Sequence, residues 1–262
     1  NAIHAAQAKG QLRTSHFIHL RCELPCADTV EAARKTVAAG DIRLISLMDH
    51  TPGYRQFVSI EKFKEYYLGK KLILPEKIED YIAEKLELQN RHAAANKIEI
   101  LNLTRSLGIS LASHDDATSG HVDEAVEDGA VIAEFPTSAE SAEAAHRHGL
   151  AVLMGAPNIV RGGSHSGNIS ATEVAAMGHL DILSSDYLPA SLLLAAFALP
   201  EQVEGMTLAK AVGFVTAKPA AAAGLDDRGE IDFGKRADLI QVSVKTGRPV
   251  VRRVWREGVR VL

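Results

Sequence analysis

The stretch Ile42-Arg-Leu-Ile-Ser-Leu-Met-Asp-His50 is a short apolar run that ends in two polar residues. Five other runs have a similar form, and they are His16–Glu23, Ile109–Asp116, Ala130–Pro136, Ala151–Pro157 and Asp181–Tyr187. Three segments between them are typical of helices that end before a glycine cap, namely Thr29–Ala39, Ala139–His148 and Ala171–Met177. Strands that alternate with helices predict βαβ units and a parallel sheet, so we expect an α/β fold.

One connection is much longer than the others and runs from Thr51 to Gly108. Pro75 suits the first turn of a helix, and Ile78 and Ile82 follow it at helical spacing. We therefore expect a helical insertion at about residues 54–107, within an α/β portion that spans residues 1–228.

The tail of the chain, residues 229–262, has a different pattern. Three short runs there predict strands, and they are Ala237–Val244, Val250–Trp255 and Val259–Leu262. The segments between these runs have turn character, as in Arg256-Glu-Gly258. We expect a small β unit beside the α/β portion.

The composition is that of a globular protein. Hydrophobic residues make up 46% of the 262 residues and charged residues 24%, which provides enough apolar material for a core. No apolar run has the roughly 18 residues of a membrane span, and the formal net charge of -4 does not favour nucleic acid as a partner. We expect neither partner. Two cysteines, Cys22 and Cys26, make no disulfide framework, which is typical of the cytoplasm.

Ionisable residues stand at or near the carboxyl end of five predicted strands. These residues are Glu23, His50, His114, Glu134 and Asp186. The carboxyl ends of parallel strands meet at one edge of a sheet, where α/β enzymes place their chemistry. Buried charges without partners are costly to desolvate, and a shared metal cation offsets that cost. The pattern favours metal or acid–base chemistry over a set of unrelated structural residues.

A glycine-rich segment, Asn158-Ile-Val-Arg-Gly-Gly-Ser-His-Ser-Gly-Asn168, follows the fifth of these runs. Glycines allow the backbone to approach a ligand, and successive amides in a turn bind anions. An arginine in the same segment adds a side chain that can donate bidentate hydrogen bonds to phosphate. We expect an anion-binding loop made of Arg161, Gly162, Gly163, Ser164, His165 and Asn168. The alternative is a flexible surface loop that caps a helix.

Several longer motifs resemble one known family. The motifs are His19-Leu-Arg-Cys-Glu-Leu-Pro25, Leu47-Met-Asp-His-Thr-Pro-Gly53, Ala112-Ser-His-Asp-Asp-Ala-Thr118, Gly155–Asn168 and Leu183-Ser-Ser-Asp-Tyr-Leu-Pro189. They closely resemble the amidohydrolase-superfamily component of the carbon–phosphorus lyase pathway, the α-D-ribose 1-methylphosphonate 5-triphosphate diphosphatase family. The tail Gly229–Leu239 resembles the wider superfamily. This resemblance implies an amidohydrolase-type (β/α)8 barrel with a small C-terminal β-sandwich portion.

The resemblance also implies a reaction and a set of site residues. The substrate is a phosphorylated sugar phosphonate, hydrolysed to the 5-phosphate and pyrophosphate in phosphonate degradation. One or two divalent metals, zinc or manganese, activate water. Glu23, His50 and His114 are the implied metal ligands, and Asp186 is the implied general base. The expected partners of the metal ligands are Asp115, Asp116 and Glu134. The glycine-rich segment around Arg161 is expected to hold phosphoryl or phosphonate oxygens.

Two other functions remain open at this stage. One is a generic metal-dependent amidohydrolase or deaminase acting on a C–N bond, and the other is a non-catalytic partner of the phosphonate-degrading assembly. A homo-oligomer and an association with phosphonate-pathway proteins are both compatible with the sequence. A closed barrel has eight strands and about six precede the tail, so we expect this sequence to lack the first barrel strands and the first part of the sandwich.

Overall fold

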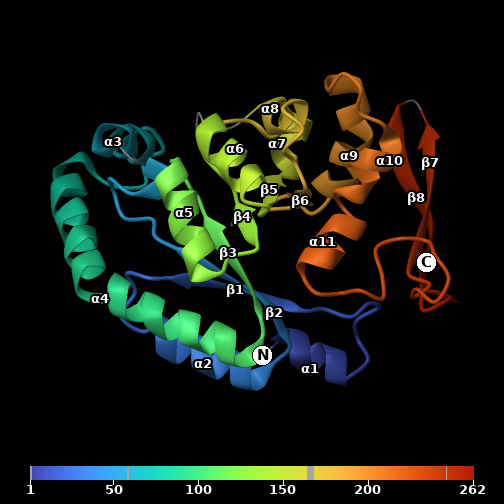
Figure 1. Cartoon of the computed structure of the whole chain (residues 1–262), viewed down its shortest axis with the longest axis horizontal. Helices are drawn as coiled ribbons and strands as arrows, with labels where there is room; N and C mark the ends of the chain where they lie inside the picture. The colour runs from blue at the N-terminus through green and yellow to red at the C-terminus, as the bar shows by residue number, and fades with distance from the viewer. Residues whose placement is uncertain (1, 58, 164–167, 246) are drawn as a thin grey trace. The chain divides into compact units, whose positions relative to one another are not determined.

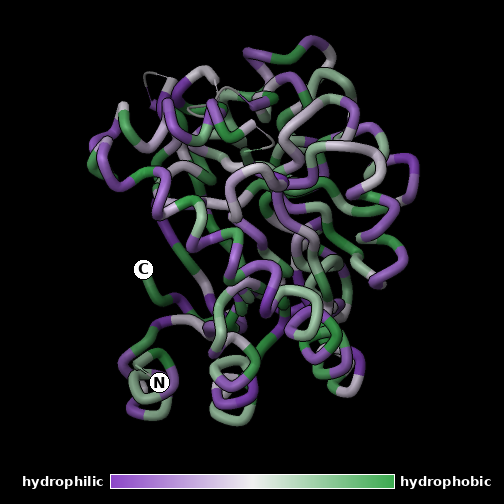
Figure 2. Tube along the Cα trace, turned by 90° about the vertical axis from the view of Figure 1, so that its left-hand side faces the viewer, coloured by the Kyte–Doolittle hydropathy of each residue, from purple (hydrophilic) through white to green (hydrophobic). Residues whose placement is uncertain are grey.

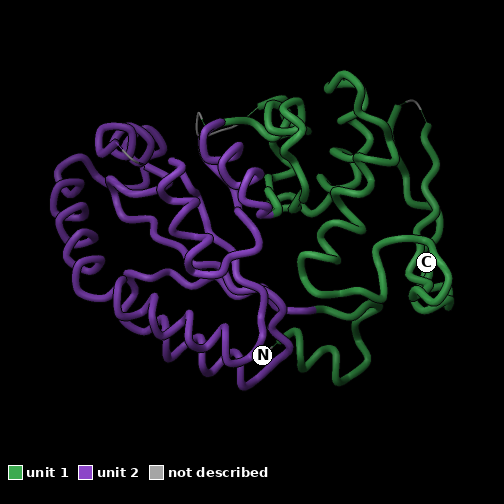
Figure 3. Tube along the Cα trace, in the orientation of Figure 1, with its two compact units in different colours: residues 1–16, 151–262 green, residues 17–150 purple. Residues whose placement is uncertain are grey.

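The computed structural model describes residues 2–57, 59–163, 168–245 and 247–262. The chain forms two compact units, shown in Figure 3. Unit 2 is Phe17–Leu150, and unit 1 combines Asn1–His16 with Ala151–Leu262. The predicted boundary between residues 228 and 229 lies inside unit 1, where it precedes the C-terminal strands.

Unit 2 is built on four parallel strands that follow one another in chain order (Figure 1). They are β1 (Ile18–Glu23), β2 (Ile42–Met48), β3 (Ser110–His114) and β4 (Ile132–Glu134). Helix α2 (Thr29–Ala39) connects β1 to β2, α5 (Ser119–Asp128) connects β3 to β4, and α6 (Ala139–Arg147) follows β4. The predicted βαβ pattern is therefore confirmed in this unit.

The strands of unit 2 bury one face against helices. Cys22, Ile45, Leu47 and Leu111 of β1–β3 join the same apolar cluster as Ile100 of helix α4 (Ile78–Leu107). Because side chains alternate along a strand, the residues between them point to the opposite face. That opposite face carries the polar residues of the candidate site. In Figure 2, hydrophobic and hydrophilic residues are mixed along the turns of the helices.

The long connection of unit 2 contains helices. It contains η1 (Arg55–Phe57), α3 (Ile60–Gly69), η2 (Pro75–Lys77) and the 30-residue α4 (Ile78–Leu107). Phe63, Ile78 and Ile82 form a small core of their own within this insertion. Helix α4 ends at Gly108, whose φ of 62° is the left-handed conformation that glycine adopts without strain.

In the part of unit 1 that the structure describes, two parallel strands, β5 (Ala151–Gly155) and β6 (Ile182–Ser184), are accompanied by six helices. The helices are α1 (Ala2–Ala8), α7 (Ala156–Arg161), α8 (Ala171–Ala176), α9 (Ser191–Gln202), α10 (Leu208–Gly213) and α11 (Ala217–Ala222). An antiparallel sheet closes the chain, with β7 (Leu239–Lys245), β8 (Arg248–Arg256) and β9 (Val259–Arg260) in that order. This sheet is the small β unit that the tail pattern predicts.

Both predicted runs of unit 1 extend beyond their strands. The run Asp181–Tyr187 is a strand only from Ile182 to Ser184. The run Ala151–Pro157 is a strand only to Gly155, and the glycine-rich segment begins as the short helix α7. Pro157 explains the change, because its fixed φ and missing N–H suit the first turn of a helix. Across the parts of the chain that the structure describes, no helix combines the length and the apolar character needed to cross a membrane.

Candidate metal centre

Four parallel strands bring their carboxyl ends to one edge of the sheet in unit 2. Glu23 ends β1, His114 ends β3 and Glu134 ends β4, while His50 follows the last residue of β2 by two positions. His114 and Glu134 are directly paired in the register of β3 and β4. The parallel register thus places side chains that are distant in sequence at the same edge.

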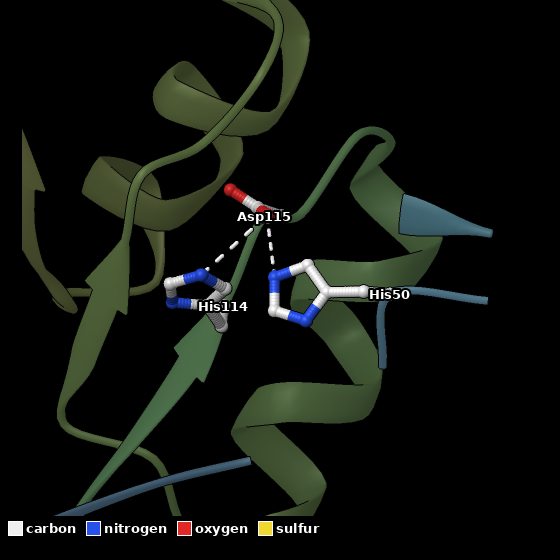
Figure 4. A group of neighbouring side chains, drawn as sticks. All are labelled: His50, His114 and Asp115. Carbon is white, nitrogen blue, oxygen red and sulfur yellow. Dashed lines mark ion pairs between the residues drawn. The ribbon is translucent and has the colours of Figure 1, made fainter. Parts of the chain in front are cut away.

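Two histidines and an aspartate form the centre of this edge. The side chains of His50, His114 and Asp115 each offer a metal-ligand atom, and these atoms all lie within 4.8 Å of one another. Oδ2 of Asp115 is 3.6 Å from Nε2 of His50 and 3.5 Å from Nε2 of His114. Figure 4 shows the carboxylate facing both rings, which meet edge to face with centroids 5.4 Å apart.

Each histidine is held at its other nitrogen by a glutamate. Nδ1 of His50 lies 2.6 Å from Oε2 of Glu23, and the backbone N–H of His50 donates to Oε1 of the same carboxylate at 2.9 Å. Nδ1 of His114 lies 2.8 Å from Oε2 of Glu134, which also accepts a hydrogen bond from the Ser46 hydroxyl. Carboxylates on Nδ1 fix the tautomer that leaves Nε2 free to bind a metal.

The pKa values of the centre follow from burial and from these contacts. Burial alone would raise the pKa of Glu23, but its hydrogen bonds to His50 and the histidine charges lower it. Burial alone would lower the pKa of His50, but the hydrogen bond to Glu23 and the nearby carboxylates raise it. The pKa of Asp115 is raised, mainly by burial. The pKa of Glu134 is lowered, because contacts with His114 outweigh its burial.

Two turn residues beside the centre have left-handed backbone conformations. Asp115 has φ of 55° directly after β3, and Phe135 has φ of 56° directly after β4. The N–H of Asp115 donates to the carbonyl of Glu134 at 2.9 Å, and the Phe135 ring packs edge to face on His114. Left-handed conformations are strained for bulky residues and cluster at functional sites. These turns direct Asp115 toward the two histidines.

The donors present fit a divalent cation. Oδ2 of Asp115 is buried and has no hydrogen-bond partner among the described residues, which is costly for a carboxylate oxygen. It faces two imidazole nitrogens, and a cation among the three would satisfy all of them. Imidazole and carboxylate donors suit zinc and manganese.

The residues of unit 2 that the sequence predicts for the site lie in different positions relative to the central group. His50 and His114 belong to the central group, whereas the Glu23 carboxylate contacts His50 instead. Asp115, expected only as a supporting residue, faces both histidines, and the carboxylate of Glu134 contacts Nδ1 of His114. A left-handed turn after β3 is the reason for the position of Asp115.

Asp116 points away from the histidines. Its carboxylate is paired with Arg55 and accepts a hydrogen bond from Ser113. Arg55 also contacts Glu124 of α5 at 2.9 Å. Burial raises the pKa of Asp116 to about 6. Asp116 therefore connects the insertion to the turn after β3 rather than supporting a histidine, contrary to the expectation.

Three polar residues beside the centre had no role in the sequence prediction. Nε2 of His19 lies 2.5 Å from the hydroxyl of Ser46, and Arg21 approaches His114. Side chains alternate between the two faces of a strand, so His19 and Arg21 of β1 lie on the same face as Glu23. This alternation is the sequence signal that places both residues beside the centre.

Within the described part of the glycine-rich segment, the amides of Gly162 and Gly163 differ from those of an anion-binding turn. Gly162 caps helix α7 with φ of 82°, and its N–H donates to the carbonyls of Asn158 and Ile159. The N–H of Gly163 donates to the carbonyl of Asn158 at 2.9 Å. The two glycine amides thus satisfy helix carbonyls, and the helix-capping alternative describes this part better.

The other residues predicted for unit 1 are placed as follows. Arg161 is exposed, and its Nη1 donates to the hydroxyl of Tyr187 at 3.1 Å. Asn168 is half-buried, while Ser164 and His165 lie outside the described residues. Asp186 is exposed and has φ of 46°, two residues after β6. The roles of Arg161, Asn168 and Asp186 stay predictions.

Comparisons with known proteins agree with the fold. The Amidohydrolase family model matches residues 90–261. The chain is 52% identical over its whole length to the alpha-D-ribose 1-methylphosphonate 5-triphosphate diphosphatase of Escherichia coli (strain K12), of which it covers 69%. The crystal structure of an amidohydrolase from Thermotoga maritima MSB8 has the same fold, with a TM-score of 0.51 and 18% identity, over 94% of this chain and 62% of that chain. The strand-end histidines, the fold and these matches together show that the chain belongs to the amidohydrolase family.

Proposed function

We propose that this protein hydrolyses α-D-ribose 1-methylphosphonate 5-triphosphate to the 5-phosphate and pyrophosphate. The observation that carries the proposal is the 52% identity, over all 262 residues, to the Escherichia coli (strain K12) protein named for this reaction. The match spans the whole chain and therefore covers the positions of the candidate site residues in both units. The family assignment independently supports a hydrolase.

The centre of unit 2 is the proposed cation site. His50, His114 and Asp115 would hold a divalent cation, zinc or manganese. Glu23, predicted from the sequence as a ligand, would orient the His50 ring through its contact with Nδ1. Such a cation activates water by lowering its pKa and offsets the charge of phosphoryl oxygens. Glu134 would keep His114 in the tautomer that binds the cation through Nε2, because its carboxylate lies 2.8 Å from Nδ1.

The protein's own groups would carry the remaining steps. Water adds to a phosphorus atom of the triphosphate, and the bridging P–O bond between the first and second phosphoryl groups breaks. Asp186 would accept the proton of the attacking water as general base. Arg161 and Asn168 would bind phosphoryl or phosphonate oxygens and offset their negative charge. The products are a 5-phosphate and pyrophosphate, and one water molecule is consumed.

We also propose that the reaction takes place in the cytoplasm. Cys22 is buried and Cys26 is exposed, and both are free thiols, as expected in a reducing compartment. Assembly into a homo-oligomer or with phosphonate-pathway proteins stays a prediction.

A substrate comparison tests the proposal. The intact protein is incubated with the sugar phosphonate triphosphate and, separately, with cyclic amides and aminated bases. We expect pyrophosphate release from the triphosphate and no hydrolysis of C–N bonds. Turnover of a C–N substrate in place of the triphosphate would support the deaminase or amidohydrolase alternative. No turnover of either substrate by the metal-loaded protein would support a non-catalytic partner.

A further inference from the structure

Arg21 reaches from β1 to the centre of the site. It shares a face with Glu23, because the two residues are two positions apart on one strand. In the strand register, Arg21 lies beside Ser46 of β2. Its side chain extends along this face, where Nε donates to the sulfur of Met48 at 3.2 Å and Nη2 lies 3.5 Å from Nε2 of His114.

Both contacts of Arg21 are with weak or neutral acceptors. A thioether sulfur is a weak acceptor, and a guanidinium has five N–H donors to satisfy. Arg21 forms no ion pair with any carboxylate of the described chain, although Glu23, Asp115 and Glu134 surround the same centre. The residue is exposed, so its guanidinium is accessible to a ligand. Most of its donor capacity therefore remains for an acceptor that the protein does not supply.

The contact with His114 is the one that a bound cation would replace. Glu134 holds Nδ1 of His114, which leaves the lone pair of Nε2 for either Arg21 or a cation. A cation on that nitrogen removes this acceptor from Arg21 and places two positive groups side by side. Their repulsion is relieved when an anion lies between them and contacts both.

We infer that Arg21 is a substrate-binding residue that holds an oxyanion, a phosphoryl or phosphonate group, of the ligand bound beside the cation. The planar guanidinium can donate two parallel hydrogen bonds to such a group, which an ammonium cannot do. The inference rests on the proposed function and deepens it. It also assigns anion recognition to unit 2, the unit that carries the metal centre, in addition to the role predicted for Arg161.

The test uses Arg21→Gln in the intact protein, with manganese as the cation and inorganic pyrophosphate as the anionic probe. Manganese binding and pyrophosphate binding are each measured by titration calorimetry. We expect pyrophosphate to bind about tenfold to a hundredfold more weakly, since a charge-assisted hydrogen bond is lost. Manganese affinity should be unchanged or tighter, because a neighbouring positive charge is removed.

Arg43→Gln is the matched control. Arg43 is also an exposed strand arginine of unit 2, on the neighbouring strand β2, but it pairs with Asp41 at 3.0 Å. We expect both affinities to stay unchanged in this variant. Arg21→Lys serves as a second test that preserves the charge, and it should recover only part of the pyrophosphate affinity.

Two outcomes would overturn the inference in different ways. If wild type and both Arg21 variants hold manganese and bind pyrophosphate equally well, Arg21 is not an anion-binding residue, while the proposed function stands. If the wild-type protein binds neither manganese nor pyrophosphate, the proposed function fails together with the inference. If Arg21→Gln does not fold, the Arg21→Lys variant provides the test. Equal pyrophosphate affinity in this variant and in the wild type would overturn the inference that Arg21 makes a bidentate contact with the anion.

Discussion

The ring of His50 lies between two carboxylates, with Glu23 at Nδ1 and Asp115 at Nε2. A protonated ring is favoured there, although burial opposes the charge. A cation has to displace this proton before it can bind the ring, so metal affinity in this centre increases as the pH rises.

The titration of His50 in the metal-free protein is the first prediction at this scale. The pKa of His50 is raised and that of Glu23 is lowered in the folded state, so the His50–Glu23 pair adds stability between these two pKa values. This stability is lost as the pH rises through the pKa of His50 and as it falls through the pKa of Glu23. We expect an NMR titration midpoint above 6.5. In Glu23→Gln the midpoint should fall, because the raising contact is lost. A midpoint below 6.5 in the wild type would show that burial outweighs Glu23.

Glu134 provides the second prediction, because it contacts His114 without facing the central group. Replacing it by Gln removes the charge that orients the ring, and metal affinity should fall about tenfold to a hundredfold. Glu140→Gln is the control, since Glu140 is a glutamate of helix α6 whose carboxylate contacts Ser119 rather than a histidine of the centre. Metal content after dialysis at a fixed free concentration measures both variants. Equal affinity in the two variants would remove Glu134 from the support of the centre.

At the scale of elements, Arg55 links the insertion to the strands. It joins η1 to Asp116 in the turn after β3 and to Glu124 of α5, and only 16% of its side chain is exposed. The pair with Asp116 is almost fully buried on the carboxylate side. Breaking such a pair leaves a buried charge without a partner, which is strongly destabilising.

Arg55→Met is therefore the third prediction. We expect the free energy of unfolding to fall by about 3 kcal/mol or more, as for other broken buried pairs. Arg34→Met is the comparison, since the Arg34–Glu99 pair is about half exposed on both sides and should contribute at most about 1 kcal/mol. Urea unfolding of both variants gives the two values. Similar small losses would mean that Arg55 is effectively solvated.

The sequence predicts the elements better than the contacts between their side chains. All six predicted runs contain a strand, because apolar runs that alternate with helices leave few other arrangements in an α/β fold. Alternation also identifies the face of β1 that carries Glu23 and Arg21. It does not determine the backbone conformation of the residue after a strand, and the left-handed φ of Asp115 brings this side chain into the centre.

The glycine-rich segment shows the same limit. Glycines allow left-handed backbone conformations, but such conformations occur both in anion-binding turns and at the caps of helices. Ala156 and Pro157 begin a helix, and the carbonyls of this helix accept hydrogen bonds from the amides of Gly162 and Gly163. That choice depends on the length of α7, which the local sequence signals leave undetermined.

At the scale of the whole molecule, the centre depends on residues from four strands of unit 2. A cation that binds this arrangement and not the unfolded chain must stabilise the fold. At a free concentration a hundredfold above its Kd, the gain is about 2.7 kcal/mol.

Thermal unfolding with and without metal is the fourth prediction. We expect a higher Tm with added zinc or manganese than with a chelator, and the difference should be lost in a His50→Ala, His114→Ala double variant. The double variant removes both imidazole donors of the group. An equal response of the wild type and the double variant would place the bound metal elsewhere in the molecule.

A 31P NMR assay of the triphosphate substrate with metal-stripped and metal-reloaded protein tests whether the metal centre hydrolyses the triphosphate to pyrophosphate. We expect pyrophosphate and the 5-phosphate in equal amounts from the reloaded protein, and neither product above background from the stripped protein or the double histidine variant. Release of single terminal phosphates, or pyrophosphate release that does not depend on metal, would contradict this expectation.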